Sequence, residues 1–143
     1  MPFFRLKNNP FPNDGLFSVE FGIQYLTIFP AGDGLALSFI LQPNITPGWD
    51  NNPISLWQDN GRDCFRFVRY GNNAVTLDSN DLNYHVVKIS YDGAKYYGYI
   101  DGILRYTSPS TPRVGELRFG HPFYSNLPGW TGFRLDYIKV TNP

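Results

Sequence analysis

The chain has 143 residues, enough for one domain with a sizeable core. Its 12 Lys and Arg residues balance its 12 Asp and Glu residues, so its summed charge attracts neither a nucleic-acid backbone nor an anionic membrane. Aromatic residues make up 17% of the chain beside 14 Gly and 12 Pro, a composition that favours short strands and tight turns over long helices.

The predicted elements are short strands separated by turn residues. Apolar residues alternate from Phe17 to Ile23, which is typical of a half-buried strand. Asp92-Gly93 and Asp101-Gly102 are the strongest hairpin signals. In chain order, strands are expected at 17–23, 34–41, 54–57, 64–70, 74–77, 84–91, 95–100, 103–106, 116–120 and 130–141. The segment 2–12 is expected to form an edge strand against the closing strand, with an assembly arm as the alternative.

This pattern predicts an all-β fold, with two antiparallel sheets connected as a jelly roll in a single domain, residues 1–143. No helical periodicity is sustained over three turns. Much of the core is expected to come from Phe17, Val19, Phe21, Leu37, Phe39, Phe65, Phe67, Val87, Ile89, Leu117, Phe119, Leu135 and Ile138.

Three segments resemble the concanavalin A-like lectin/glucanase jelly rolls, a superfamily that includes the L-type lectins and the laminin G-like modules. The segment 32–36, Gly-Asp-Gly-Leu-Ala, is similar to the L-type lectin motif whose aspartate contacts sugar hydroxyls, which is Asp33 here. The hairpin pair at 84–102 resembles the laminin G-like branch, and 130–140 is similar to the closing strand of the superfamily. The resemblance implies the fold, which carries lectins, hydrolases and structural modules alike.

The chain departs from the metal-binding and catalytic motifs of that superfamily. The region 64–70 has arginines and aromatics where legume-type lectins hold calcium and manganese. The one dense oxygen cluster lies at 78–81, around Asp78 and Asp81, and is expected to be a solvated turn. No metal and no other cofactor is therefore expected.

Catalytic residues are not expected either. Glu20 and Glu116 are the only glutamates, and neither has an acidic partner at alternate positions, whereas glycoside hydrolysis needs two flanking carboxylates. His85 is expected to be a strand-end residue bonded to backbone rather than a catalytic base. The chain is therefore predicted not to be an enzyme.

A binding function remains, in which aromatic faces meet sugar C–H groups and planar polar groups meet hydroxyls. The glycines beside Asp33 allow close approach to a ligand, and Trp49 lies in a loop without apolar periodicity that would bury it. The candidate ligand-binding residues are Asp33, Gly34, Trp49, Asp50, Tyr124 and Asn126.

Two functions fit these observations. The first is a non-catalytic, lectin-like module that binds carbohydrate, alone or mounted on a larger assembly. The second is a structural interaction protein, such as a virus or phage decoration or fibre-associated protein. The expected partner is a glycan or the protein surface of a larger assembly. A homo-oligomer is compatible with both functions. Neither nucleic-acid binding nor membrane insertion is expected. The lone Cys64 and the lack of a signal sequence before Phe3 fit a cytoplasmic or virion-associated protein, although the localisation stays unknown.

Overall fold

The computed structural model describes residues 4–5, 16–26, 35–42, 54–59, 64–68, 75–79, 82–108, 116–119 and 133–141, with side chains for 16–26, 82–108 and 134–141. All of its regular elements within these ranges are strands. They are β1 (Phe4–Arg5), β2 (Phe17–Tyr25), β3 (Leu35–Gln42), β4 (Ile54–Asp59), β5 (Cys64–Val68), β6 (Val75–Ser79), β7 (Tyr84–Tyr91), β8 (Tyr96–Ile100), β9 (Ile103–Thr107), β10 (Glu116–Phe119) and β11 (Phe133–Thr141).

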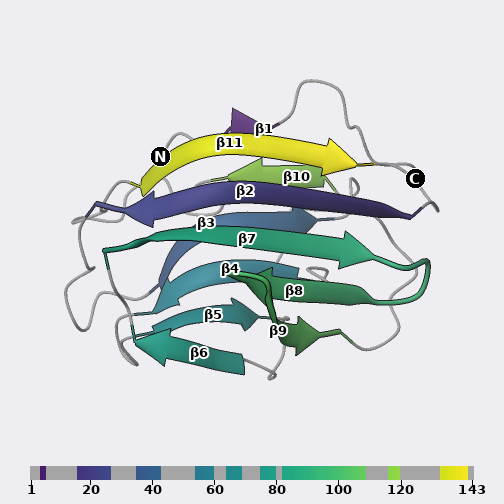
Figure 1. Cartoon of the computed structure of the whole chain (residues 1–143), viewed down its shortest axis with the longest axis horizontal. Helices are drawn as coiled ribbons and strands as arrows, with labels where there is room; N and C mark the ends of the chain where they lie inside the picture. Colours follow the sequence, from purple (N-terminus) through teal and green to yellow (C-terminus); the bar gives the residue numbers. More distant parts are fainter. Residues whose placement is uncertain are drawn as a thin grey trace.

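The strands form two antiparallel sheets. One has the order β1-β10-β3-β4-β5-β6 and the other the order β11-β2-β7-β8-β9. Figure 1 shows the five-stranded sheet in front of the six-stranded sheet. The predicted all-β jelly-roll sandwich is therefore confirmed.

The described core lies on the inner face of the five-stranded sheet. Burial in β2 alternates because its odd-numbered residues point toward the other sheet, as the period of a strand requires. Leu135, Ile138 and Val140 of β11 pack partly buried against this layer. The buried hydrophobic residues of the described part are Phe17, Val19, Phe21, Ile23, Tyr25, Val87, Ile89, Tyr91, Tyr96, Ile100 and Tyr106.

The buried set confirms the predicted core residues in β2 and β7 and adds tyrosines that the sequence did not single out. Tyr91 and Tyr96 stack with ring centroids 4.6 Å apart, and Phe17 lies within 6.1 Å of both rings. The Tyr91 hydroxyl donates to the Gly93 carbonyl at 2.9 Å, so its polar end is satisfied at the hairpin turn. The side chains of the predicted core residues in β3, β5 and β10 lie outside the described part.

A bulge in β11 shapes the outer face of the sheet. Leu135 pairs with Ile23 and Ile138 pairs with Phe21, so Asp136 and Tyr137 both stand opposite Gly22. The extra residue turns both side chains away from the core. This bulge builds the site described below.

Two expectations about strands are wrong. The N-terminal strand β1 pairs with β10, with Phe4 opposite Phe119, whereas the closing strand β11 pairs with β2 in the other sheet. Asp78 and Ser79 belong to β6, where they pair with Phe65 and Cys64, so this part of the cluster is strand rather than turn.

Within the described ranges there is no helix long and apolar enough to cross a membrane.

Candidate functional site

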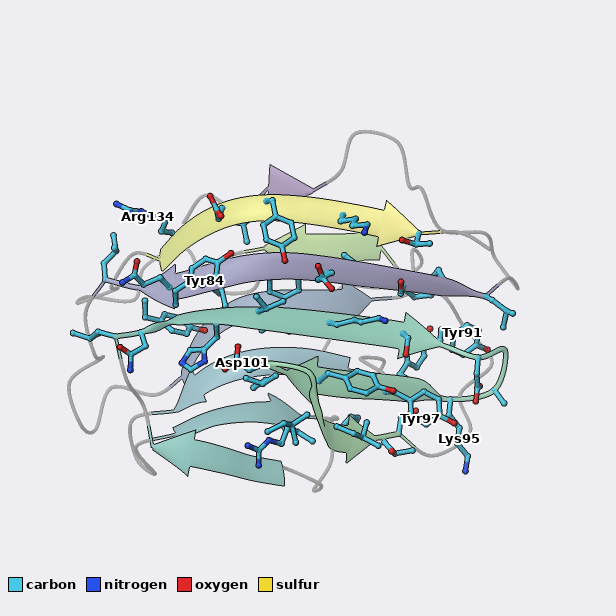
Figure 2. The ribbon with its side chains drawn as sticks, in the orientation of Figure 1. Tyr84, Tyr91, Lys95, Tyr97, Asp101 and Arg134 are labelled. Carbon is cyan, nitrogen blue, oxygen red and sulfur yellow. The ribbon has the colours of Figure 1, made fainter. Side chains whose placement is uncertain are left out.

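The outer face of the five-stranded sheet carries a cluster of tyrosines and carboxylates around one glycine. We call Gly22, Tyr84, Asp136, Tyr137 and Glu20 the Gly22 platform. Its residues come from β2, β7 and β11, which are neighbours in the sheet. Figure 2 shows Tyr84 on the side of this sheet that faces the viewer.

Gly22 is buried although it lies on the outer face, because the ring of Tyr84 covers it. A Cβ built on Gly22 would overlap the phenol oxygen and neighbouring ring atoms of Tyr84. Tyr84 stands opposite Gln24, two residues from Gly22, so its side chain reaches diagonally across β2. The hydroxyl end of the ring packs on the glycine, yet the residue stays 43% exposed.

Both phenols of the platform donate to carboxylates. The Tyr84 hydroxyl donates to Asp136 Oδ2 at 3.3 Å, and the Tyr137 hydroxyl donates to Glu20 Oε1 at 2.9 Å. Each bond joins two strands, and a donor paired with a charged acceptor makes a stronger hydrogen bond than a neutral pair. The two aromatic side chains are therefore held in fixed positions on the sheet.

The platform keeps its phenols protonated. Desolvation, followed by the negative charges of Asp136 and Glu20, raises the pKa of Tyr84. Desolvation and the hydrogen bond to Glu20 raise the pKa of Tyr137 to about 12. Both tyrosines are therefore neutral hydrogen-bond donors at physiological pH, beside two carboxylates.

Positively charged residues lie on the strands around the carboxylates of this cluster. Lys139 on β11 and Lys88 on β7 each stand opposite Glu20. The Lys88 Nζ lies 6.0 Å from the ring centroid of Tyr99, at the outer limit of a cation–π contact. Arg134, the second residue of β11, stands opposite Gln24. The outer face thus mixes both signs of charge with exposed aromatic rings.

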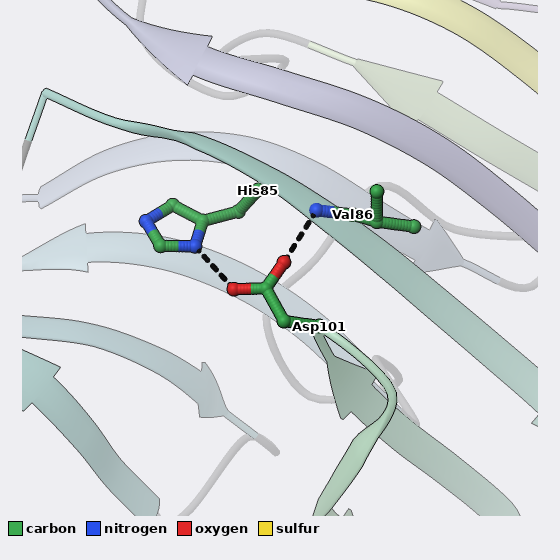
Figure 3. Close-up of polar contacts among 3 residues, drawn as sticks. All are labelled: His85, Val86 and Asp101. Carbon is green, nitrogen blue, oxygen red and sulfur yellow. Dashed lines mark hydrogen bonds and ion pairs between the residues drawn. The ribbon is translucent and has the colours of Figure 1, made fainter.

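A second polar contact ties the β8–β9 turn to β7. His85 Nδ1 lies 2.7 Å from Asp101 Oδ2, and the Val86 N–H donates to Asp101 Oδ1 at 2.9 Å (Figure 3). The Asp101 N–H also donates to the Val86 carbonyl at 2.8 Å. Asp101 therefore extends the ladder between β7 and β8. The sequence-based expectation was a backbone partner for His85, and the structure shows the carboxylate of Asp101 as one partner.

The ligand-binding residues predicted from the sequence all lie outside the described part of the chain. They are Asp33, Gly34, Trp49, Asp50, Tyr124 and Asn126. The residues that the structure does describe hold no group of three or more His, Cys, Asp or Glu that could bind a metal ion. Asp78 falls in β6, while Asp81 is not described.

The Gly22 platform was missed by sequence reasoning. Its one signal is a glycine inside a strand of otherwise alternating residues, which is a mark of close approach by another group. The approaching group, Tyr84, is 62 positions away in the sequence. Only the pairing of β2 with β7 brings the two together.

The sequence matches no protein-family model and none of the curated proteins. Solved structures do share the fold. An alginate lyase from polysaccharide lyase family 7 superposes with a TM-score of 0.69 at 15% identity, over 90% of this chain and 60% of the lyase. The alginate lyase from Corynebacterium sp. gives a TM-score of 0.67 at 12% identity, over 92% of this chain and 60% of the lyase.

A second group of similar structures consists of sialidases. The Trypanosoma rangeli sialidase in complex with sialic acid gives a TM-score of 0.68 at 17% identity, over 89% of this chain and 20% of the sialidase. The chain therefore spans 60% of the lyases and one fifth of the sialidase. At these identities the likeness establishes the jelly-roll β-sandwich fold alone, and it singles out neither L-type lectins nor laminin G-like modules.

The comparisons correct one prediction from the sequence. The chain was expected not to be an enzyme, but the structures that share its fold are an alginate lyase and a sialidase. The expectation rested on the missing pair of carboxylates and on the interpretation of His85 as a structural residue, and the first argument covers only glycosidases that use two catalytic carboxylates. The same structures give no support to a virion or decoration role.

Proposed function

We propose that this chain recognises saccharides. The observation that carries the proposal is that lyases and a sialidase share its fold over 89–92% of its length. Their names describe two different reactions, and a carbohydrate ligand is what the names have in common. Recognition of a saccharide is therefore a better inference from the shared fold than either reaction.

The residues that we propose for the primary site are those predicted from the sequence, with Asp33 as the main hydroxyl acceptor. A carboxylate on a glycine-flanked turn can accept two hydroxyl hydrogen bonds, and Trp49 and Tyr124 supply aromatic surface. The proposed partner is a glycan. Assembly into a homo-oligomer is compatible with this role.

The test is a glycan array with the purified chain, followed by Asp33→Ala on the best ligand. Charge-assisted hydrogen bonds contribute about 1.5–3 kcal/mol, so the affinity should fall on the order of tenfold to a hundredfold while folding changes little. Asp92→Ala is the matched control, because Asp92 is a turn carboxylate that bonds backbone N–H groups. It should lower the melting temperature and leave binding intact.

Two results would contradict this assignment. Absence of binding to any glycan by the unmutated chain overturns saccharide recognition itself. Loss of stability with unchanged binding in Asp33→Ala shows that Asp33 only caps its turn.

A second candidate is a carbohydrate-cleaving enzyme, which the lyase and sialidase neighbours favour. The measurement is the release of product from alginate and from sialylated glycans by the purified chain, followed by chromatography. Product that grows linearly with protein concentration would establish this candidate. No product from either substrate would contradict these two activities while leaving recognition standing.

A further inference from the structure

We propose that the Gly22 platform is a second saccharide-binding surface, which takes a neutral sugar chain by stacking on Tyr84 and disfavours acidic saccharides. The inference rests on the proposed function and deepens it with a surface and a ligand class. The surface lies on the outer face of the five-stranded sheet and shares no residue with the Asp33 site.

The first argument is the position of the Tyr84 side chain. Its hydroxyl end lies over Gly22, where a Cβ would overlap it, so the side chain is supported by the sheet itself, and the residue is 43% exposed. An exposed aromatic ring offers apolar surface to the C–H side of a sugar ring. Because the hydroxyl bond to Asp136 already fixes the side chain, little rotamer freedom is lost when a ligand stacks on it.

The second argument is the set of polar groups beside the ring. Asp136 and Glu20 each accept one phenol, and a carboxylate has about four lone-pair positions, which leaves capacity for sugar hydroxyls. The exposed Tyr137, at 36%, extends the aromatic surface toward Glu20. Stacking area therefore lies beside hydrogen-bond acceptors, the combination that saccharide recognition needs.

The third argument concerns the shape of the ligand. The platform spans three adjacent strands, β7, β2 and β11, on a sheet face, and neighbouring strands are about 4.8 Å apart. The surface is therefore roughly 10 Å wide, with its polar groups spread along it instead of converging on a point. Such a surface fits several units of an extended sugar chain better than one monosaccharide.

The fourth argument is electrostatic selection. Asp136 and Glu20 place two carboxylates at the phenols of Tyr84 and Tyr137. Desolvation is the main cause of the raised pKa of Tyr84, and the charges of these two carboxylates raise it further, because a second negative charge beside them is unfavourable. A ligand carboxylate placed on the ring meets the same repulsion. Lys88 and Lys139 stand opposite Glu20 and Arg134 opposite Gln24 on the same sheet face, whereas the group that contacts the Tyr84 hydroxyl is the carboxylate of Asp136.

The experiment is affinity gel electrophoresis of the full chain in gels that contain galactomannan, hydroxyethylcellulose, alginate or polygalacturonate. The unmutated chain should be retarded by at least one neutral polymer, and Tyr84→Ala should weaken that retardation on the order of tenfold. Tyr84→Phe keeps the ring and should lose threefold or less. Tyr97→Ala is the matched control, since Tyr97 is a tyrosine at the opposite end of the same sheet (Figure 2). Melting curves establish that each variant is folded.

The charge argument is tested with the double variant Glu20→Gln, Asp136→Asn. Both replacements keep an oxygen that accepts the phenols, and they remove the two negative charges. Retardation by the acidic polymers should increase at least threefold, while retardation by the neutral polymer stays within threefold. An unchanged preference would overturn the selection against acidic saccharides.

The outcomes separate this inference from the proposed function. If Asp33→Ala abolishes binding to the neutral polymers while folded Tyr84→Ala leaves it unchanged, the Gly22 platform is overturned and saccharide recognition stands. If no glycan and no polymer binds the unmutated chain, both proposals fall. If retardation is lost in Tyr97→Ala as much as in Tyr84→Ala, the effect is not specific to the platform and the inference is overturned.

Discussion

Gly22 is the residue that connects the sheet to the platform, because any side chain at this position would meet the ring of Tyr84. In an ordinary strand, replacing Gly with Ala stabilises a protein by roughly 0.5–1 kcal/mol. At Gly22 we expect the replacement to destabilise the protein instead. Gly22→Ala should displace the ring, break the bond between Tyr84 and Asp136, and cost about 1–3 kcal/mol of unfolding free energy.

A double-mutant cycle in urea checks this prediction. In a Tyr84→Ala background the ring is absent, so Gly22→Ala should become neutral or stabilising. Equal costs in both backgrounds would show that the clash with Tyr84 is not the cause.

At the scale of the element, Asp101 determines how the β8–β9 hairpin meets β7. Its φ of 51° places it in the left-handed region, followed by Gly102 at 80°, which matches a two-residue primed turn. Its carboxylate also accepts the Val86 N–H and contacts His85. Asp101→Ala should therefore cost about 1–3 kcal/mol, from lost hydrogen bonds together with strain.

Two further variants separate these causes by chemical denaturation. Asp101→Gly relieves the backbone strain but still loses the side-chain hydrogen bonds. Asp101→Asn retains an acceptor for the Val86 N–H. The expected order of stability is Asp101, then Asn, then Gly, then Ala. A Gly variant as stable as the unmutated chain would show that the carboxylate contacts contribute no more than the strain that glycine relieves.

Asp92 stabilises the β7–β8 turn in a pH-dependent way. It accepts the Tyr97 hydroxyl at 2.6 Å and the backbone N–H groups of Ala94 and Lys95 at 2.9 and 2.8 Å. The bond from Tyr97, followed by the backbone bonds, lowers the pKa of Asp92. This stabilisation is present above the unfolded-state pKa of about 3.9 and is lost as the pH falls through the lower folded-state pKa.

Asp92→Asn should accordingly flatten the acid side of the stability curve. Urea midpoints measured from pH 7 down to pH 2 should fall less steeply in this variant than in the unmutated chain. Parallel curves for the two proteins would contradict a role for Asp92 in acid unfolding.

The elements were largely predictable because local signals determine them. The predicted strand 84–91 has the bounds of β7, and Asp101-Gly102 forms the turn that its residue types favour. Strand ends were less predictable: β9 runs on to Thr107 and β2 to Tyr25, each beyond its expected end. Alternation identifies which residues share a face, but the partner strand and the end of a strand depend on tertiary pairing.

At the scale of the whole molecule, the topology and the platform needed the structure. The resemblance of three segments indicated the jelly roll, yet it did not place β1 beside β10. The platform depends on a bulge in β11 and on a tyrosine in β7, and neither position carries a local signal. Contacts between residues so distant in the chain are decided by the fold and cannot be read from spacing.

The fold should not depend on a bound metal ion. Addition of EDTA is expected to leave the melting temperature unchanged, because no dense carboxylate cage in the sequence would couple metal binding to folding. A large decrease would contradict this prediction and direct attention to Asp33, Asp78 and Asp81.

The pairing of β2 with β11 has a consequence for the synthesis of the chain. Residues 17–25 are synthesised long before residues 133–141, which form one of their two neighbouring strands (Figure 1). On the ribosome, β2 can pair with β7 first, but its other hydrogen-bonding edge lacks its native partner until β11 emerges. Closing a loop of this length before the sheet is complete makes folding slow, so the nascent chain is exposed to misassembly and to chaperones until β11 has paired with β2.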